Sequence, residues 1–303
     1  MSVSLRPPDA AFVRNALFCL TISALGAWSI SALAAPSATG AFSEFSLPNP
    51  GSGPTTVAMA RDGTVWFTES AGNRIGRMSA DGSGIVEYAL PHPNSSPRII
   101  TAGSDGNFWF SEHLGNRMGR ITPAGVITEF DIPTPDSQPR ATALGRDGNV
   151  WFGEFAAGKI GRVTPQGVIT EFDIPTPDSQ PRATALGRDG NVWFGEFAAG
   201  KIGRVTPQGV ITEFAIPTPN SGPRALAAGP DGNIWFSEFH ASKIGRMTLD
   251  GKVTEFDLPR PNSGPGDITA GADGQMWFVE LNGRMDGRVV DGNRVVRISL
   301  EAR

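Results

Sequence analysis

The sequence is poor in the residues that cross-link small exported proteins or hold metal ions. Its 303 residues include one cysteine, Cys19, three histidines and one tyrosine. One cysteine excludes an intramolecular disulfide, and no Cys/His cluster with zinc-ligand spacing is present. No Ser-His-Asp order or phosphate-binding loop appears either. The fold must therefore rest on its core alone, and a chain of this length can bury one large enough.

The sequence also lacks any run of basic residues. Its formal net charge is −4, and without Arg6, Arg14 and Asp9 in the N-terminal segment, 24 basic and 29 acidic side chains leave −5. Nucleic acids and anionic lipid surfaces attract clusters of lysine and arginine. We therefore expect no binding to nucleic acid.

The N-terminal segment is typical of a secretory signal peptide. After a positively charged start, Ala16–Ala35 is almost entirely apolar or small, and Ala32–Ala34 reads "ALA", which suits a cleavage site. We predict a signal peptide at 1–34, an exported (periplasmic or secreted) domain at 35–303, and no membrane span after cleavage. The alternative is a retained anchor, because about 20 apolar residues can just cross a bilayer.

An internal repeat dominates the rest of the chain. Six Trp-Phe pairs recur at intervals of 42 or 43 residues, and Gly125–Gln166 is identical to Gly167–Gln208 over 42 residues. Such identity indicates recent tandem duplication or strong homogenisation, which repeat architectures tolerate because each unit contacts mainly its neighbours. The pairs begin at Trp66, Trp109, Trp151, Trp193, Trp235 and Trp277.

Each unit contains four short apolar runs and no sustained helical period. In the fifth unit these are "RALAAG", "NIWFSE", "KIGRMT" and "KVTEFDLP", with hairpin signals at Asp231-Gly232 and Asp250-Gly251. Four antiparallel strands per repeat of about 40 residues is typical of a β-propeller blade. The sequence predicts an all-β propeller of six blades, with seven as the alternative.

Two strand-like segments lie at the ends of the repeat array. "FSEFSLP" (Phe42–Pro48) resembles a fourth strand with no blade before it, and "RVVRISLE" is predicted to be a fourth strand after the last Trp-Phe unit. We expect one of them to complete the final blade. The other pairs at an edge or starts an incomplete seventh blade.

Four units place an arginine directly after the proline that opens their first strand, and every unit has a glutamate after Trp-Phe. Because both lie equally far from the hairpin turn, we expect each arginine to face its glutamate at one rim of the ring. The rim is predicted either to carry structural ion pairs, worth about 0–1 kcal/mol each, or to bind a small molecule, peptide or envelope partner on a monomeric protein. Its residues are Arg98, Arg140, Arg182, Arg224, Glu112, Glu154, Glu196 and Glu238.

The first and sixth units break this pattern. Thr55 and Gly266 stand where the other units have arginine, and Asp267 follows Gly266. The two units are neighbours if the ring closes, and carboxylates are the ligands that Mg²⁺ and Ca²⁺ prefer. Glu69, Glu280 and Asp267 are therefore the predicted metal site.

The repeat resembles a known family. The stretch Asp231–Pro265, "DGNIWFSEFHASKIGRMTLDGKVTEFDLPRPNSGP", is similar to the repeats of virginiamycin B lyases, which inactivate streptogramin B antibiotics, and the resemblance extends over the chain after the N-terminal segment. It implies a propeller, which has seven blades in those enzymes, and Mg²⁺ as a cofactor. It also implies antibiotic resistance by elimination at the ester bond of a cyclic depsipeptide. The family's essential histidines follow the proline that opens an inner strand, and glutamates hold the metal.

The glutamate of this pattern is present in every unit here, whereas the histidine is absent. Elimination needs a base that accepts a proton near neutral pH, which histidine can do and arginine cannot. Other histidines are therefore the candidate catalytic residues: His92 in a rim loop and His113 beside Glu112, with His240 in a distant unit. The residues after the corresponding prolines are Thr55, Arg98, Arg140, Arg182, Arg224 and Gly266.

Three functions are open to this sequence. The first is a ligand- or partner-binding module that lacks the catalytic histidines of the family. The second is a metal-assisted carbon-oxygen lyase that uses a different base, His92 or His113. The third is a metal hydrolase similar to lactonases, which also place carboxylates at a propeller rim.

Overall fold

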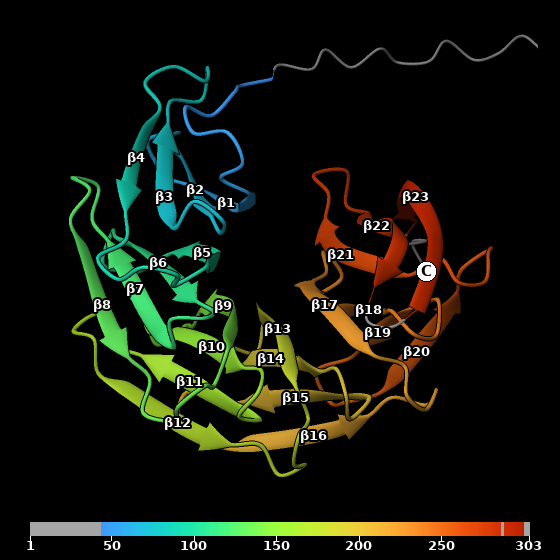
Figure 1. The fold of residues 1–303 in the computed structure, drawn as a ribbon. Helices are drawn as coiled ribbons and strands as arrows, with labels where there is room; N and C mark the ends of the chain where they lie inside the picture. The colour runs from blue at the N-terminus through green and yellow to red at the C-terminus, as the bar shows by residue number, and fades with distance from the viewer. Residues whose placement is uncertain (1–43, 286–287, 300–303) are drawn as a thin grey trace, which may run out of the picture. The chain divides into compact units, whose positions relative to one another are not determined.

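The computed structural model describes residues 44–285 and 288–299, and these residues form six antiparallel sheets (Figure 1). Neither the expected signal peptide nor its cleavage site falls within this range. The described residues contain no helix, and so none that is long and apolar enough to cross a membrane. Five sheets have four strands and the last has three, which confirms an all-β fold built from six propeller blades.

The first three blades follow the predicted repeat. Blade 1 contains β1 (Pro54–Met59), β2 (Val65–Glu69), β3 (Arg74–Met78) and β4 (Val86–Ala89). Blade 2 contains β5 (Pro97–Ala102), β6 (Phe108–Glu112), β7 (Arg117–Ile121) and β8 (Ile127–Asp131). Blade 3 contains β9 (Pro139–Leu144), β10 (Val150–Glu154), β11 (Lys159–Val163) and β12 (Ile169–Asp173).

The last three blades complete the array. Blade 4 contains β13 (Pro181–Leu186), β14 (Val192–Glu196), β15 (Lys201–Val205) and β16 (Ile211–Ala215). Blade 5 contains β17 (Pro223–Ala228), β18 (Ile234–Glu238), β19 (Lys243–Met247) and β20 (Val253–Asp257). Blade 6 contains β21 (Pro265–Ala270), β22 (Met276–Met285) and β23 (Arg288–Ile298).

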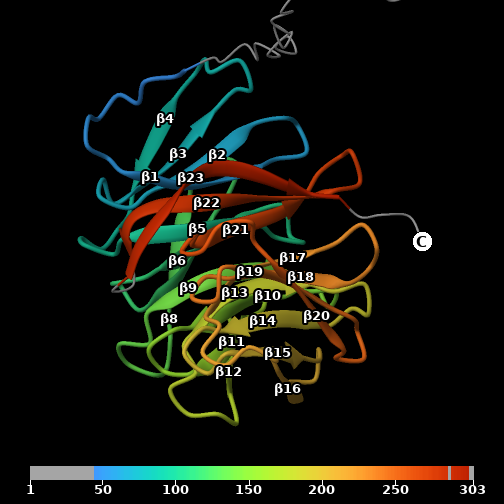
Figure 2. The same cartoon turned by 90° about the vertical axis from the view of Figure 1, so that its right-hand side faces the viewer.

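The last blade differs from the prediction. The segment expected as a fourth strand belongs to β23, which is the third strand: it pairs with the long β22, with Met276 opposite Ile298 and Glu280 opposite Arg294 (Figure 2). The described part of the N-terminal "FSEFSLP" segment, from Glu44 onward, forms no strand. Blade 6 therefore lacks a fourth strand within the described residues, because β22 continues straight into an extended hairpin where the other blades turn after five residues.

Each blade has two apolar faces because side chains alternate along its strands. In blade 3, Trp151 and Phe172 stack on one face with their ring centroids 5.5 Å apart, while Phe152 occupies the opposite face. Phe152 lies flat over Gly161 on the neighbouring strand, where an added Cβ would come within 2.1 Å of its ring. The glycine of the recurring Ile-Gly-Arg or Met-Gly-Arg motif therefore leaves the space that the phenylalanine ring occupies.

Neighbouring blades pack a tryptophan face against a phenylalanine face. Trp151 of blade 3 forms one buried cluster with Val192, Phe194 and Val205 of blade 4, and the same combination recurs at all five interfaces between consecutive blades. An arginine also spans the contact: the guanidinium of Arg162 lies 5.5 Å from the Trp151 ring and donates to the Pro207 carbonyl at 2.9 Å.

The contacts between innermost strands follow chain order. They connect β1 to β5, β5 to β9, and so on to β21, within one compact unit that spans residues 45–303. No contact of similar extent joins β21 to β1 among residues 44–285 and 288–299. The first strand of every blade thus lies on the inner side of the array, and residues at its start converge at one rim.

We expect Gly203→Ala to destabilise the fold, because its new Cβ would meet the buried Phe194 ring at 2.1 Å. Overpacking of this kind costs about 1–3 kcal/mol, which lowers the urea midpoint of unfolding. Ala198→Ser, at an exposed position in the same blade, is the control and should leave the midpoint unchanged. A stable Gly203→Ala protein would mean that the ring can move aside.

Candidate functional site

The strand register places the rim arginines and glutamates on different faces, contrary to the expected pairing. Glu154 lies opposite Pro139, not Arg140, because a β-bulge between Phe152 and Glu154 adds one residue to β9. The same shift occurs at the first strand of each of the other five blades. A one-residue shift turns a side chain to the opposite face of a strand. The bulge therefore turns Arg140 away from Glu154. The glutamates are buried within the blades.

In blades 1 to 5 the buried glutamate is close to a second glutamate on the outermost strand, whereas Glu280 of blade 6 accepts a hydrogen bond from Arg294 at 3.2 Å. Glu154 is 0% exposed, and neither of its carboxyl oxygens has a hydrogen-bond partner within the described residues. Its neighbour Glu171 accepts hydrogen bonds from the Thr134 amide and hydroxyl at 2.8 and 3.0 Å, and lies 3.8 Å from Lys159 Nζ. The outer glutamate therefore has hydrogen-bond and charge partners, whereas the inner one has no hydrogen-bond partner.

This environment raises the pKa of the inner glutamates. Burial is the main cause and the charge of the outer glutamate the second, and together they raise the pKa of Glu154, Glu196 and Glu238 to about 8. The pKa of Glu112 rises to about 7 for the same reasons, through burial and Glu129. At neutral pH Glu154, Glu196 and Glu238 therefore keep a proton.

Three of the four rim arginines instead stack on phenylalanines that directly follow the buried glutamates, whereas His113 follows Glu112 in the blade of Arg98. The Arg140 guanidinium lies 3.6 Å from the centroid of the Phe155 ring, Arg182 lies 4.5 Å from Phe197, and Arg224 lies 5.0 Å from Phe239. These distances are within the range of cation–π interactions. These phenylalanines were not predicted as site residues, although their position after Trp-Phe-x-Glu in blades 3, 4 and 5 is visible in the sequence.

The charges of this arginine cluster (Arg98, Arg140, Arg182 and Arg224) act on one another and on His113. The pKa of Arg98 is lowered by burial and then by the charge of Arg224, three blades away along the chain. The pKa of His113 is lowered to about 4 by burial, then by Arg140 and Arg98. The arginines of different blades therefore converge on a shared space in which positive charge accumulates and His113 is neutral.

The structure does not bring the two candidate catalytic histidines together. His92 is exposed and contacts Glu129 on β8 through Nδ1. His113 belongs to the arginine cluster, with a buried Nδ1 that has no hydrogen-bond partner among the described residues. His240 packs against Phe197, with ring centroids 4.9 Å apart.

The residues at the rim do not fit a magnesium site. The described part of the chain contains no group of three or more His, Cys, Asp or Glu side chains placed to share a metal, so Glu69, Glu280 and Asp267 are not assembled. The carboxyl pairs offer two groups each, but a lysine or arginine accompanies them, such as Lys243 Nζ at 3.6 Å from Glu255. A metal cation would have to bind between the two carboxyl groups of a pair. There the charge is already balanced by a lysine or arginine side chain and by a retained proton.

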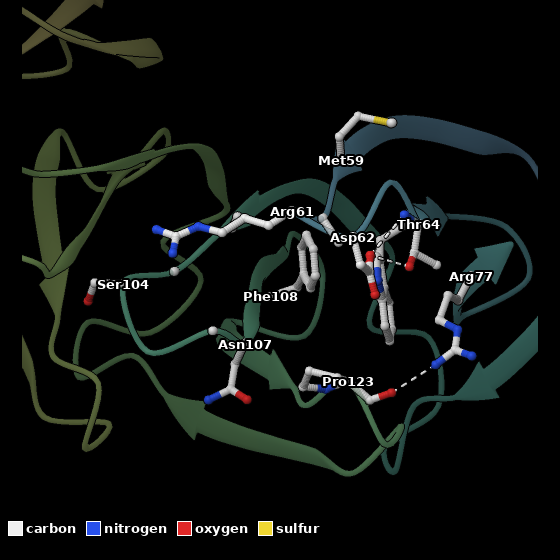
Figure 3. Close-up of a pocket in the computed structure, with 14 residues that line it drawn as sticks. Met59, Arg61, Asp62, Thr64, Arg77, Ser104, Asn107, Phe108 and Pro123 are labelled. Carbon is white, nitrogen blue, oxygen red and sulfur yellow. Dashed lines mark hydrogen bonds between the residues drawn. The ribbon is translucent and has the colours of Figure 1, made fainter. Parts of the chain in front are cut away.

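A separate cavity of about 320 Å³ lies between blades 1 and 2, at the end of β1 away from the rim (Figure 3). Two of its polar side chains already have partners: Arg77 donates to the Pro123 carbonyl at 2.9 Å, and Asp62 accepts from the amide and hydroxyl of Thr64. Nothing in this cavity is poised for catalysis, so the arginine cluster is the stronger candidate site.

The carboxyl pairs predict a dependence of stability on pH. Each inner glutamate has an ordinary pKa of 4.5 when unfolded and about 8, or about 7 for Glu112, when folded, so the native state binds more protons between these values. The free energy of unfolding should therefore fall as pH rises from about 5 to 8. The quadruple variant E112Q/E154Q/E196Q/E238Q, which cannot lose these protons, should lose most of this slope in urea unfolding at pH 5, 7 and 9.

The control for this test is E213Q, which removes the ionised member of one pair. The pKa of Glu213 is lowered, with burial opposing the lowering and Thr176 and Lys201 causing it through hydrogen bonds. E213Q should destabilise the protein at neutral pH while leaving the slope from the other blades. An unchanged slope in the quadruple variant would show that the buried glutamates are not its origin.

Comparisons with known proteins agree with this architecture. The sequence profile of the Virginiamycin B lyase family matches residues 29–234 and 218–303. Virginiamycin B lyase from Staphylococcus aureus is 39% identical with a TM-score of 0.74, over 83% of this chain and 86% of that one. A catalytically inactive His-to-Ala variant of that enzyme, solved with quinupristin, is 39% identical with a TM-score of 0.76, over 84% and 87% of the two chains.

A second solved streptogramin B lyase is 34% identical with a TM-score of 0.75, over 86% of this chain and 87% of that one. Regucalcin from Agrobacterium tumefaciens, 16% identical with a TM-score of 0.53, covers 75% of this chain and 81% of its own and shares the fold alone. A search of curated proteins gives no match. From the repeat, the six sheets and these similarities, the chain belongs to the virginiamycin B lyase family.

Proposed function

We propose that this protein is a binding module whose arginine cluster takes an anionic small molecule. The observation that carries the proposal is the convergence of four arginines at positions that follow the opening prolines of β5, β9, β13 and β17. A guanidinium is permanently charged and presents a planar fork of donors that matches carboxylate, sulfate or phosphate groups. The stacked phenylalanines hold the guanidinium groups of Arg140, Arg182 and Arg224 in place, so little side-chain entropy is lost on binding.

The same residues argue against chemistry at these positions. The related enzyme from Staphylococcus aureus is catalytically inactive when one histidine is replaced by alanine. Here the positions after the opening prolines hold threonine, arginine or glycine. Arginine has no lone pair with which to remove a proton, although it can bind the negative charge of a ligand.

Export would place this site in the periplasm or outside the cell, as the N-terminal segment predicts. Binding there needs neither a metal nor a bound cofactor, since the guanidinium groups supply the charge. The ligand itself is defined by its chemistry: an anion small enough to reach Arg98, Arg140, Arg182 and Arg224 together, with an apolar or aromatic part that can contact the phenylalanines.

The proposal predicts loss of anion binding in Arg182→Gln. Titration calorimetry with phthalate, an aromatic dicarboxylate, should show binding that weakens with added salt, and Arg182→Gln should weaken it by about tenfold, which corresponds to one charge-assisted hydrogen bond of ~1.4 kcal/mol. The matched control is Arg188→Gln, which removes the same charge just after the other end of β13, where Arg188 donates to the Pro230 carbonyl. Equal loss in both variants would point to a general charge effect and contradict a site at the rim.

A second candidate function is a carbon-oxygen lyase with His113 as its base. His113 favours it because the ring is neutral, with its pKa lowered to about 4 by burial and the neighbouring arginines, and its buried Nδ1 is available to accept a proton. Arg98 and Arg140 would then stabilise the developing enolate charge. A base with this pKa removes protons slowly, because the most effective bases titrate near the working pH.

Incubation of the chain from Ala35 onward with a streptogramin B depsipeptide and Mg²⁺ separates the two functions. Elimination opens the ring without a change of mass, so the product is detected by its chromatographic retention and linear fragment ions, whereas hydrolysis adds one water. We expect unchanged antibiotic, consistent with a binding module. Linear product that is lost in H113A and kept in H92A would establish the lyase instead.

A further inference from the structure

The cavity between blades 1 and 2 lies where a hydrogen bond of the repeat is missing. In blades 2 to 6 the indole N–H of the Trp-Phe tryptophan donates to the aspartate of the preceding turn, as Trp151 does to Asp147 at 3.3 Å. In blade 1, Asp62 instead accepts from the amide and the hydroxyl of Thr64, both through Oδ1. Trp66 lines the cavity and is only 2% exposed, yet its indole N–H has no acceptor among residues 44–285 and 288–299.

Two residues in the turn of blade 1 account for the missing bond. Ala60 stands where blades 2 to 6 have glycine, and in those blades an added Cβ would come within 2.5 Å of the aspartate Oδ1 and within 2.7 Å of the tryptophan ring. Thr64 stands where blades 2 to 5 have an asparagine, whose side chain donates to Oδ2 of the aspartate. The backbone of the turn is unchanged, since the Ala60 amide donates to the Thr64 carbonyl at 2.8 Å, the same distance as in blade 3. The side chains of Ala60 and Thr64 therefore separate Asp62 from Trp66.

The edge of this interface is also left open. In blades 2 to 4 the residue before the turn aspartate lies within 3.3 Å of a Cβ built on the turn glycine of the next blade, and Ser104 donates to the Gly148 carbonyl at 2.6 Å. Arg61 holds this position in blade 1, but nothing lies within 4 Å of a Cβ built on Gly106. The guanidinium of Arg61 is exposed and forms no hydrogen bond or ion pair within the described part of the chain.

The cavity combines apolar walls with charged groups of both signs. Met59, Trp66 and Phe108 supply apolar surface. Arg61 extends to one side of the Phe108 ring, and Asp62 lies on the other side (Figure 3). The volume of about 320 Å³ is at the lower end of the range for small-molecule sites. The space therefore suits a molecule of about one ring.

The groups on the two sides of the cavity select different ligand chemistry. Asp62 uses Oδ1 for both bonds to Thr64, so Oδ2 can accept a hydrogen bond, whereas the Trp66 indole can only donate one. A hydroxyl group satisfies both, because it accepts from the indole and donates to the carboxylate. Arg61, on the other side, matches a carboxylate, which its guanidinium can bind through two parallel hydrogen bonds.

We propose that this cavity is a second ligand site, separate from the arginine cluster, for a single-ring molecule with a hydroxyl at one end and a carboxylate at the other. The hydroxyl binds Trp66 and Asp62, the ring contacts Met59 and Phe108, and the carboxylate binds Arg61. A buried donor without a partner carries a desolvation cost, and the ligand hydroxyl removes that cost by accepting from the indole.

The test uses para-hydroxyphenylacetate, which carries the two groups at opposite ends of one ring. It should shift the NMR signal of the Trp66 indole N–H, assigned with Trp66→Phe, in a saturable way. Phenylacetate lacks the hydroxyl and para-methylphenol lacks the carboxylate, so each should bind about tenfold more weakly, as expected for the loss of one charge-assisted hydrogen bond. A Trp66 signal that does not respond to the probe would overturn the proposal, and equal affinities of the three compounds would contradict the ligand chemistry.

The double variant A60G/T64N gives blade 1 the residues that blades 2 to 5 have at these positions. It should allow Trp66 to donate to Asp62 and so abolish the response to the probe. The urea midpoint should not fall, because four blades of the same protein fold with this glycine and asparagine. Binding that persists in A60G/T64N would mean that the probe binds elsewhere.

Arg61→Gln tests the carboxylate end and should weaken binding of the probe about tenfold. The matched control is Arg146→Gln, which removes the same charge at the equivalent position of blade 3 and should leave the affinity unchanged. Equal weakening in both variants would indicate a general charge effect and contradict a contact with Arg61. Because the signal arises at Trp66, at the other end of the blades from the arginine cluster, the result does not depend on whether that cluster binds phthalate.

Discussion

The structure depends on one repeated contact, in which the tryptophan face of a blade lies against the phenylalanine face of the next. The stacked Trp151 and Phe172 rings, with Arg162 over them, supply one side, and Phe194 with Val192 and Val205 supplies the other. A single blade cannot bury its two apolar faces alone. The contact supplies the missing burial, fixes the order of the blades, and sets the direction in which the first strand of each blade points.

The position of the rim residues follows from that direction together with a bulge. The bulge in each first strand turns the arginine away from the glutamate of the second strand, and Arg140, Arg182 and Arg224 contact the ring of the residue after that glutamate. The glutamates and the arginines therefore lie in different electrostatic environments. Burial and the outer glutamates raise the pKa of Glu112, Glu154, Glu196 and Glu238, whereas burial and the charges of Arg140 and Arg98 lower the pKa of His113. The chain has the family's fold, and positive charge accumulates at this rim.

The fold could be predicted from the sequence almost completely, whereas the site could be predicted only in part. The 42-residue period, the Asp-Gly turns and the alternation around Trp-Phe define blades, strands and their order, because these depend on local chemistry. The facing of Arg140 and Glu154 could not be predicted, since counting residues from a turn assumes a regular ladder and the bulge breaks it. The assignment of β23 failed because its short valine-rich runs suit a third strand as well as a fourth. The stacking of Arg140 on Phe155 depends on the strand register and on the packing of neighbouring blades. A local sequence pattern predicts neither of these.

The duplicated segment has a consequence for how such a protein changes over generations. Gly125–Gln166 does not coincide with a blade: it begins just before β8, the outer strand of blade 2, and ends just after β11 of blade 3. The copied unit therefore contains the interface between two blades, and the end of one copy joins the start of the next copy without a mismatch. An unequal crossover within the identical tract would add or remove one whole interface between blades without requiring any new side-chain packing. Each such event would also change the central charge by one arginine, so the selectivity of the rim and the number of blades are inherited together.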